Sequence, residues 1–388
     1  MSDHSFIGPS GASRWIACPL SAYLHRQMGE VRSGQAAIKG SVFHKGLELA
    51  LTGEAEPWEL IGERLEVGRD PNTRAIIRDE FTSDMADQVE ELMAWVRENI
   101  HPEAGFAVER RLAAPHVHPE MFGTVDILAI LDEHMWVVDG KNGRTEVEIG
   151  TEKAPNAQLA LYAFMADLTD IKHVTLAVYQ PNTPGPAFKV LELPAKAILN
   201  WVEREVIPAL AEYDAIQETG SGEPREGPHC VWSPSKMLCP AMQSRMAKLK
   251  EIMMNPEYQF TDAELVYWLD WAPAIRHLLG QFEDEALARL STGAELKSPE
   301  LGKYQVGRST RHRVWKPGAE KTLFEKYGKA IYSTTLKTPA ALQKELGLDA
   351  VAEYAYQPEG AAKLVRPGER SAPKRTGASV FAKFQPKE

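Results

Sequence analysis

Two aspartates stand inside apolar, strand-like stretches of this sequence of 388 residues. Asp126 lies within the run GTVDILAIL (123–131), and Asp139 closes the run MWVVD (135–139). An ionised carboxylate in apolar surroundings is costly unless it is paired, hydrogen-bonded or bound to a metal. If the two runs are adjacent antiparallel strands, their carboxylates can form a site for a hard divalent cation.

A lysine follows the second aspartate at a spacing that suits a strand. Side chains on a strand alternate between its two faces, so Lys141 should point to the same face as Asp139. Two carboxylates and one ammonium group could therefore converge on one small volume. The alternative is a simple hairpin turn, because the dipeptides at 139–140 (Asp-Gly) and 142–143 (Asn-Gly) are typical of turns.

The hydrophobic periodicity predicts the elements that would position these residues. Short runs rich in Val, Ile, Phe and Trp indicate a strand meander between helices. A stretch rich in Gly, Pro and Ser at 218–240 marks a boundary, and the tail from 366 is predicted to be irregular. We expect helices over 14–28, 38–53, 74–100, 156–168, 195–217, 261–290 and near 319–328, and strands over 106–114, 123–131, 135–143 and 174–181.

The charge distribution indicates local contacts with phosphate. The net charge is −10, yet 303–316 carries +5 and 361–388 carries another +5, so the rest of the chain carries −10 − 10 = −20. Such basic segments on an acidic body suit a protein that contacts phosphate locally; solvated loops are the alternative. The residues expected to contact DNA in the first segment are Arg308, Arg311, Arg313 and Lys316.

Several classes of protein are disfavoured by composition. No stretch of about eighteen apolar residues is present, and the N-terminus has neither a basic leader nor an apolar signal region. Only three cysteines occur, which is too few for a disulfide scaffold. We expect a cytoplasmic protein without a membrane partner.

The aspartates and the lysine resemble the motifs of the PD-(D/E)XK nuclease superfamily, with Asp126 as the first acid and 139–141 as the D-x-K. Three further features resemble the RecB-like branch. Gln158 and Tyr162 lie one helical turn apart in NAQLALYAF, and His44 lies in the upstream helix GSVFH. The opening SGASRWIACP resembles the start of such nucleases. The later region is similar to a prophage-encoded family of RecB-like proteins.

The resemblance implies a mixed α/β (α+β) fold and a metal site. Residues 1–240 would form a restriction-endonuclease-like core, with a central mixed sheet flanked by helices. Residues 241–388 would form a C-terminal helical and mixed extension with a basic tail. One or two Mg²⁺ or Mn²⁺ ions would be held by His44, Asp126, Asp139 and the carbonyl of Gly140.

The remaining site residues would act on water and DNA. Lys141 would orient or deprotonate the attacking water, and Gln158 and Tyr162 would face the DNA backbone. Glu109, in the strand FAVER, is a further acidic candidate. The alternatives are structural: a packed or exposed helix histidine at position 44, a core tyrosine at position 162, and a solvated, helix-stabilising Glu48.

The cysteines match part of an iron–sulfur motif of RecB-like proteins. Cys18, Cys230 and Cys239 stand at three ligand positions of a [4Fe–4S] cluster, but Ser233 stands at the fourth. Serine is a poor iron ligand. Three readings stay open: an intact cluster, zinc bound by the three cysteines with His229, or a staple packed by apolar contacts.

The leading functional hypothesis is a metal-dependent DNA nuclease, an exonuclease of phage or prophage replication and recombination. Its partners would be DNA and a phage single-strand annealing or DNA-binding protein, with oligomers conceivable. A second hypothesis is a catalytically silent nuclease fold that binds DNA ends or a protein. A third is an unrelated metalloenzyme acting on a small phosphate ester. The sequence contains no P-loop motif, so unwinding driven by ATP would require another chain.

Deletion of residues 361–388 should weaken DNA binding and flatten its salt dependence. Each lost phosphate contact removes roughly 0.9 from the log–log slope for duplex DNA. Cleavage chemistry should persist, because the segment holds none of the expected metal-site residues. The measurement is affinity against salt concentration, with metal chelated. Identical slopes for the full-length and truncated proteins would mean that this tail does not contact DNA.

Overall fold

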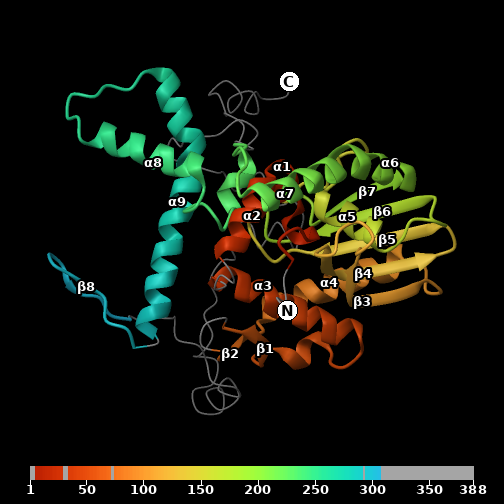
Figure 1. The fold of residues 1–388 in the computed structure, drawn as a ribbon. Coiled ribbons are helices and arrows are strands. Elements are labelled where there is room, and N and C mark those ends of the chain that lie inside the picture. The colour runs from red at the N-terminus through yellow and green to blue at the C-terminus, as the bar shows by residue number, and fades with distance from the viewer. Residues whose placement is uncertain (1–4, 29–33, 71–73, 292, 307–388) are drawn as a thin grey trace, which may run out of the picture. The chain divides into compact units, whose positions relative to one another are not determined.

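The computed structural model describes residues 5–28, 34–70, 74–291 and 293–306, all within one compact unit, Met1–Gly307 (Figure 1). The N-terminal part is mainly helical and also contains a β-hairpin. Its elements are η1 (Pro9–Gly11), α1 (Ala12–Ala17), α2 (Pro19–Met28), α3 (Gln35–Leu51), η2 (Pro57–Leu60), β1 (Arg64–Arg69), β2 (Ile76–Glu80) and α4 (Ser83–Asn99).

A five-stranded mixed sheet forms the centre of the fold. Its order is β3-β4-β5-β6-β7, with every neighbouring pair antiparallel except the parallel pair β5 and β6. The crossover between the parallel strands contains α5 (Ala157–Met165). The strands are β3 (Gly105–Ala113), β4 (Phe122–Leu131), β5 (His134–Gly140), β6 (His173–Tyr179) and β7 (Phe188–Pro194). The expected mixed α/β fold with helices flanking a central sheet is confirmed.

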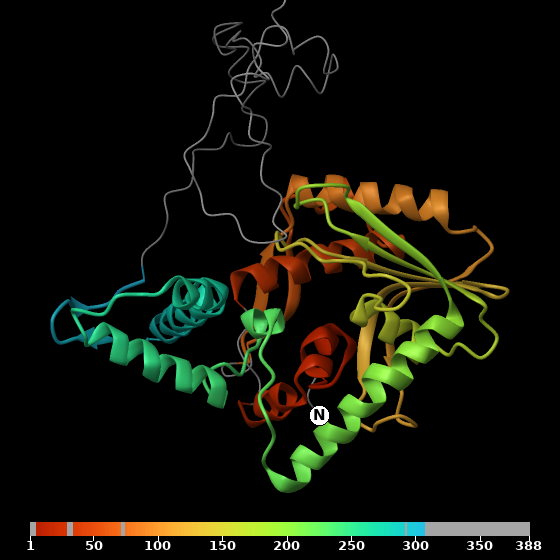
Figure 2. The ribbon, with the colours of Figure 1, turned by 90° about the horizontal axis from the view of Figure 1, so that it is seen from above.

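Helices cover both faces of this sheet. Figure 2 shows α4 and α7 (Ile207–Thr219) on opposite sides of it. The cross-strand neighbours Leu128 and Val137 belong to the cluster beneath α5 and α7, whereas Ile127 and Val138 pack with α3 and α4. The alternating side chains of apolar strands therefore supply two cores, one on each face of the sheet.

The chain after the sheet is helical. The predicted helix over 195–217 is confirmed as α6 (Ala195–Trp201) and α7, joined by a π-helical turn, η3 (Val202–Val206). A short helix η4 (Pro228–Trp232), α8 (Pro240–Met253) and α9 (Asp262–Ser291) follow, then a small hairpin of β8 (Lys297–Ser298) and β9 (Gly302–Lys303).

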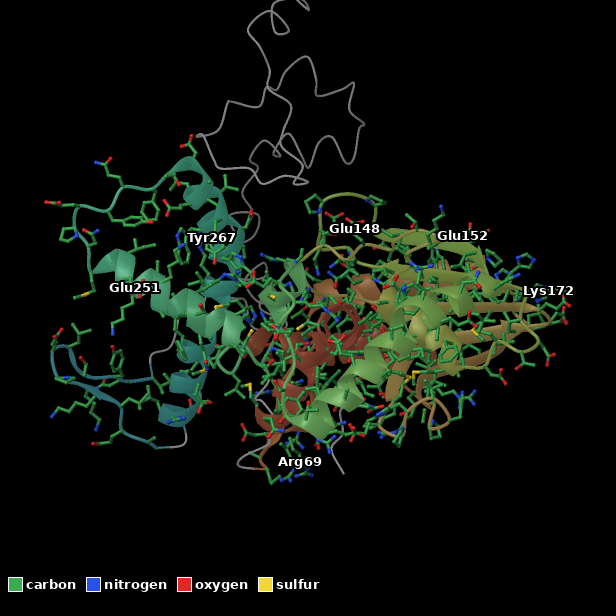
Figure 3. The ribbon with its side chains drawn as sticks, turned by 45° about the horizontal axis from the view of Figure 1, so that its top comes forward. Arg69, Glu148, Glu152, Lys172, Glu251 and Tyr267 are labelled. Atoms are coloured by element: carbon green, nitrogen blue, oxygen red, sulfur yellow. The ribbon has the colours of Figure 1, made fainter. Side chains whose placement is uncertain are left out.

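An arginine joins the two long helices of this region. Cζ of Arg245 on α8 lies 3.3 Å from the ring centroid of Trp271 on α9, and Nε of Arg245 donates a hydrogen bond of 2.6 Å to the hydroxyl of Tyr267. Figure 3 labels Tyr267 on α9 and Glu251 on α8. Cation–π stacking thus attaches α8 to α9. The predicted domain boundary at residue 240 coincides with the start of α8 but stays a prediction.

Other sequence predictions need correction. The segment 74–100 begins as strand β2, and the helix starts only after Thr82, whose hydroxyl caps it by accepting from the amide of Met85. The single helix expected over 14–28 is divided at Cys18 because Pro19 disfavours a helical residue before it. Strands β1 and β7 and helix α8 were not predicted. The expected helix near 319–328 and the tail from 366 lie outside the described residues.

No helix in the described part of the chain is long and apolar enough to cross a membrane.

Two glycines of α3 should respond oppositely to substitution by alanine. A Cβ at Gly46 would lie 2.1 Å from Cε2 of Phe81, which is fully buried, whereas a Cβ at Gly40 would meet nothing within 4 Å. Gly46→Ala should destabilise the fold by about 1–3 kcal/mol through overpacking. Gly40→Ala should stabilise it by up to about 1 kcal/mol through helix propensity. Urea unfolding measures both, and equal midpoints would contradict this packing of α3.

Candidate metal centre

Helix α3 brings one polar face to an open cavity of about 600 Å³. The spacing of this face follows the helical period, while the opposite face packs into the core that α3 shares with α4. His44 is therefore directed toward the cavity by the burial of its neighbours Val42, Phe43 and Leu47. The residues of α3 that line the cavity are Ser41, His44, Lys45 and Glu48.

The two aspartates lie on adjacent antiparallel strands, as predicted. Ile127 of β4 pairs with Val138 of β5, so the next position along each strand places Asp126 beside Asp139. Oδ2 of Asp126 accepts a hydrogen bond of 2.8 Å from the backbone amide of Gly140 and lies 3.2 Å from Nδ1 of His44. These contacts compensate the burial of the Asp126 carboxylate, whose side chain is 9% exposed.

Asp139, Lys141 and Gln158 form a closed triangle. Nζ of Lys141 donates to Oδ1 of Asp139 at 2.9 Å and to Oε1 of Gln158 at 3.1 Å, and Nε2 of Gln158 donates to the same Oδ1 at 2.9 Å. Lys141 lies just beyond β5, and its amide donates to the carbonyl of Tyr179, which continues the β5–β6 ladder. The predicted convergence of both aspartates and the lysine is therefore present in the structure.

Glu109 is brought close to His44 and Asp126. It lies on β3 opposite Asp126, with a left-handed backbone (φ 46°) that is uncommon for a residue other than glycine. Its Oε1 is 3.7 Å from Nδ1 of His44. The three side chains can each offer a ligand atom, all within 4.8 Å of one another. Glu109, a further acidic candidate from the sequence, thus belongs to the group of potential metal ligands.

The predicted ligand set differs in detail from this group. Asp139 pairs with Lys141, and the Gly140 contact is made by its amide rather than by its carbonyl. Oδ2 of Asp139 is nevertheless buried without a hydrogen bond; Nζ of Lys141 lies 2.7 Å away as an ion pair. That oxygen keeps capacity for a cation, and carboxylate oxygens with one imidazole suit Mg²⁺ or Mn²⁺. Ligation by Asp139 and by the carbonyl of Gly140 stays a prediction.

The histidine and the glutamate have shifted proton affinities. Burial lowers the pKa of His44, but the charges of Asp126 and Asp139 and the hydrogen bond to Asp126 outweigh burial and raise it to about 9. Burial and the negative charge of Asp126 raise the pKa of Glu109 to about 7, against the opposing effect of His44. Near neutral pH a metal ion would therefore compete with protons for both groups.

The two aspartates and the lysine form a coupled set. Burial raises the pKa of Asp126, but His44 and Lys141 outweigh it and hold that pKa below its ordinary value. Burial and Asp126 raise the pKa of Asp139, although Lys141 opposes them. For Lys141, the attraction of both aspartates overcomes burial and raises the pKa of the ammonium group. Lys141 is thus a cation throughout the neutral range.

Helix α5 presents the predicted glutamine and tyrosine to the same cavity. Asn156 caps this helix by accepting from the amides of Gln158 and Leu159. Gln158 meets the Asp139–Lys141 pair, whereas Tyr162 is 3% exposed and belongs to the core beneath α5 and α7. Tyr162 therefore combines the core packing considered for it with a place on the cavity wall.

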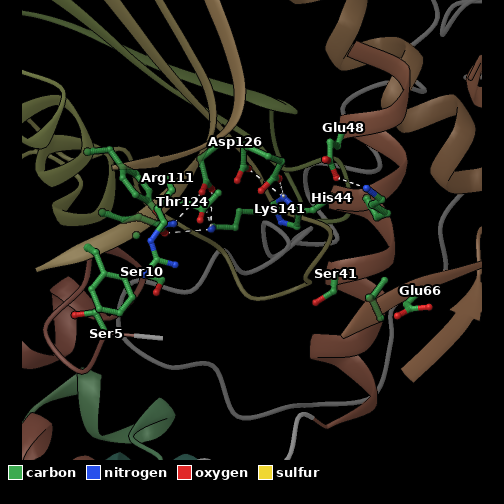
Figure 4. A pocket seen from close by; sticks show the side chains of 18 residues that line it. Ser5, Ser10, Ser41, His44, Glu48, Glu66, Arg111, Thr124, Asp126 and Lys141 are labelled. Carbon is green, nitrogen blue, oxygen red and sulfur yellow. Dashed lines mark hydrogen bonds and ion pairs between the residues drawn. The ribbon is translucent and has the colours of Figure 1, made fainter. Parts of the chain in front are cut away.

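Arg111 and Thr124 on the cavity wall were not predicted. Arg111 and Thr124 lie on one side of Asp126, and His44 and Glu48 lie on the other (Figure 4). Glu48 forms an ion pair within the helix, with Nζ of Lys45 at 2.7 Å. A signal for Arg111 existed in the sequence, since it follows Glu109 by two residues on a predicted strand.

The three cysteines and the serine line one small cavity of about 30 Å³. Cys18, Cys230 and Cys239 therefore face the same cavity. In the part of the chain that the structure describes, the only grouped ligand atoms are those of the His44 triad, and a ring nitrogen of His229 instead contacts the carbonyl of Arg225 at 3.0 Å. An iron–sulfur cluster or zinc at this cavity stays a prediction.

A buried lysine stands beside the cysteines. Lys236 is 1% exposed. Its Nζ donates a hydrogen bond of 2.7 Å to the carbonyl of Ser233 and lies 3.0 Å from Nδ1 of His277. Burial lowers its pKa to about 8. The basic residues expected to contact DNA, at positions 308–316, lie outside the described residues.

Comparisons with known proteins gave a family match and a structural match. The model of a family described as "Protein of unknown function (DUF2800)" matches residues 4–371. A solved structure titled "Crystal structure of SSO0001" aligns with 59% of this chain and 96% of its own, at 12% identity and a TM-score of 0.26.

Mn²⁺ affinity should increase from about pH 6 to about pH 9, because the metal competes with protons on groups whose pKa values are raised to about 7 and about 9. Glu109→Gln should weaken binding and flatten the lower part of this profile. The matched control is Glu48→Gln, which removes a carboxylate from the same cavity wall. Calorimetry at several pH values measures both. An unchanged profile in Glu109→Gln would remove Glu109 from the site.

Proposed function

This chain belongs to the DUF2800 family, and we propose that it is a nuclease that uses Mg²⁺ or Mn²⁺ to hydrolyse phosphodiester bonds in DNA. The observation that carries the proposal is the convergence of three carboxylates, one histidine and one lysine at one open cavity. The resemblance to the RecB-like branch of the PD-(D/E)XK superfamily favours an exonuclease of phage or prophage recombination.

The donor set supports a hard divalent cation. His44, Glu109 and Asp126 would hold it, with Oδ2 of Asp139, which forms an ion pair with Lys141, close by. When bound, such an ion would polarise the scissile phosphate and lower the pKa of an attacking water. The carboxylates compensate the charge of the ion, and the Gly140 amide keeps Asp126 in place.

Lys141 supplies positive charge beside the reacting phosphate. Its ammonium group is oriented by Asp139 and Gln158, and both aspartates keep it protonated. A fixed cation stabilises negative charge that develops on phosphate oxygens, and it needs no reorganisation to do so. Of the two roles expected for this lysine, the raised pKa favours orientation and charge stabilisation over deprotonation of water.

Asp139→Asn and Lys141→Met should each reduce metal-dependent DNA cleavage by about a hundredfold or more, because the first removes the carboxylate that orients Lys141 and the second removes the ammonium charge beside the reacting phosphate. Both substitutions nearly preserve side-chain volume, so the fold should persist. Lys45→Met is the matched control: this lysine lines the same cavity but pairs with Glu48. Its activity should stay within a few fold.

The assay uses linear and circular DNA labelled at the ends of the linear form, with Mg²⁺, Mn²⁺ or EDTA. Cleavage of linear DNA alone would indicate an exonuclease. Full activity in a folded Asp139→Asn protein would refute this assignment of the site. Tight DNA binding by the wild type with no cleavage under any metal condition would favour the silent binding module instead.

A further inference from the structure

We infer that Arg111 forms a second phosphate-binding subsite on the wall of the cavity, and that it holds the phosphate next to the one at the metal centre. The inference rests on the proposed nuclease function and deepens it, because it assigns the direction in which a nucleic acid strand lies. The subsite is built from strands β3 and β4, beyond the residues that could bind metal.

Arg111 differs from the other basic residues of the cavity in having no acidic partner. Three lysines and arginines line the cavity; Lys141 pairs with Asp139, and Lys45 pairs with Glu48. Among the described residues no carboxylate pairs with Arg111, although the cavity holds several. Its guanidinium stacks instead on the ring of Phe122, 4.3 Å from the centroid.

This stacking prepares the guanidinium for an anion. The aromatic ring restrains the side chain through its face and leaves the N–H groups at the edge free. A planar guanidinium binds phosphate oxygens through two parallel hydrogen bonds, which are stronger than hydrogen bonds between neutral groups. An exposed, restrained cation beside a cluster of carboxylates is best explained by a ligand that carries negative charge.

The register of the two strands gives the spacing. Arg111 of β3 pairs with Thr124 of β4. Glu109 and Asp126 lie two residues away on the same two strands, and all four residues line the one cavity. Two residues of a strand extend about 7 Å. This spacing is comparable to that between neighbouring phosphates of an extended nucleic acid strand, so one phosphate can occupy the metal centre while the next meets Arg111.

The N-terminal segment borders the far side of this subsite. Ser10 of η1 lines the cavity, and a Cβ at Gly123 would lie 2.8 Å from Cδ of Pro9, which shows how closely η1 packs on β4. The hydroxyl groups of Ser10 and Thr124 add neutral donors near Arg111. The substrate strand would therefore run from the metal centre along β3 and β4 toward η1.

Arg111→Gln tests the subsite, because glutamine keeps methylene groups that can pack on Phe122 but carries no charge. The matched control is Arg110→Gln: Arg110 is the next residue of β3, is also exposed, and lies on the opposite face of the strand, outside the cavity. Binding of a short single-stranded DNA is measured against salt concentration with EDTA present. We expect Arg111→Gln to weaken binding about tenfold and to lower the log–log slope by about 0.7, as for one lost phosphate contact. Arg110→Gln should change neither.

Hydrolysis provides a second readout. Bis(p-nitrophenyl) phosphate has one phosphate and cannot occupy both subsites, so the ratio of kcat/KM for the oligonucleotide to that for this ester should fall about tenfold in Arg111→Gln. Arg111→Lys, which keeps the charge but loses the planar donor pair, should retain the salt slope with reduced affinity. If Arg111 had a purely structural role, Arg111→Gln would lower kcat/KM for both substrates equally and leave their ratio unchanged.

The outcomes separate the subsite from the nuclease assignment. Equal salt slopes for the wild type and Arg111→Gln, or an unchanged substrate ratio, would overturn the subsite. If the wild type cleaves neither substrate but the binding slope still falls in Arg111→Gln alone, the subsite stands and the proposed hydrolysis fails.

Discussion

The compensation of buried negative charge between β4 and β5 is the constraint on which the site depends. Asp126 and Asp139 lie side by side in a sheet whose neighbouring residues are apolar, so each carboxylate requires a partner. Asp126 obtains the amide of Gly140 and the ring of His44, and Asp139 obtains Lys141 and Gln158. Helices α3 and α5, which pack on the sheet through their apolar residues, each contribute one of these partners.

The mixed topology of the sheet makes that compensation possible. The parallel pairing of β5 with β6 continues one residue past β5, where the amide of Lys141 donates to the carbonyl of Tyr179 at 2.7 Å. The backbone of Lys141 is therefore fixed by the sheet, and its ammonium group reaches Asp139 from there. The crossover between these parallel strands contains α5, which carries Gln158 to the same point. One topological feature thus positions two of the partners of Asp139.

The cavity wall places a group of potential metal ligands beside a single arginine. His44, Glu109 and Asp126 form the group suited to a cation, and Arg111 stands two residues away along β3 without an acidic partner among the described residues. Glu109 adopts a left-handed backbone within a strand, an unfavourable conformation that persists only where the surrounding structure imposes it. An acidic cation site beside an available guanidinium is the arrangement that a phosphodiester with a bound metal would require.

The sequence alone determined the local features of this site. Period-two alternation in apolar runs predicted β4 and β5 with their aspartates, and helical spacing predicted α3 with His44 and α5 with Gln158, because these patterns depend only on residues near one another in the chain. It did not determine strands β2 and β7, most of whose residues are at least partly exposed. Only the tertiary structure placed Glu109 beside His44, stacked the guanidinium of Arg111 on the ring of Phe122, and brought three distant cysteines to one cavity. Those relations depend on strand register and helix packing between segments far apart in the sequence, and the periodicity of one segment carries no information about the segment it will meet.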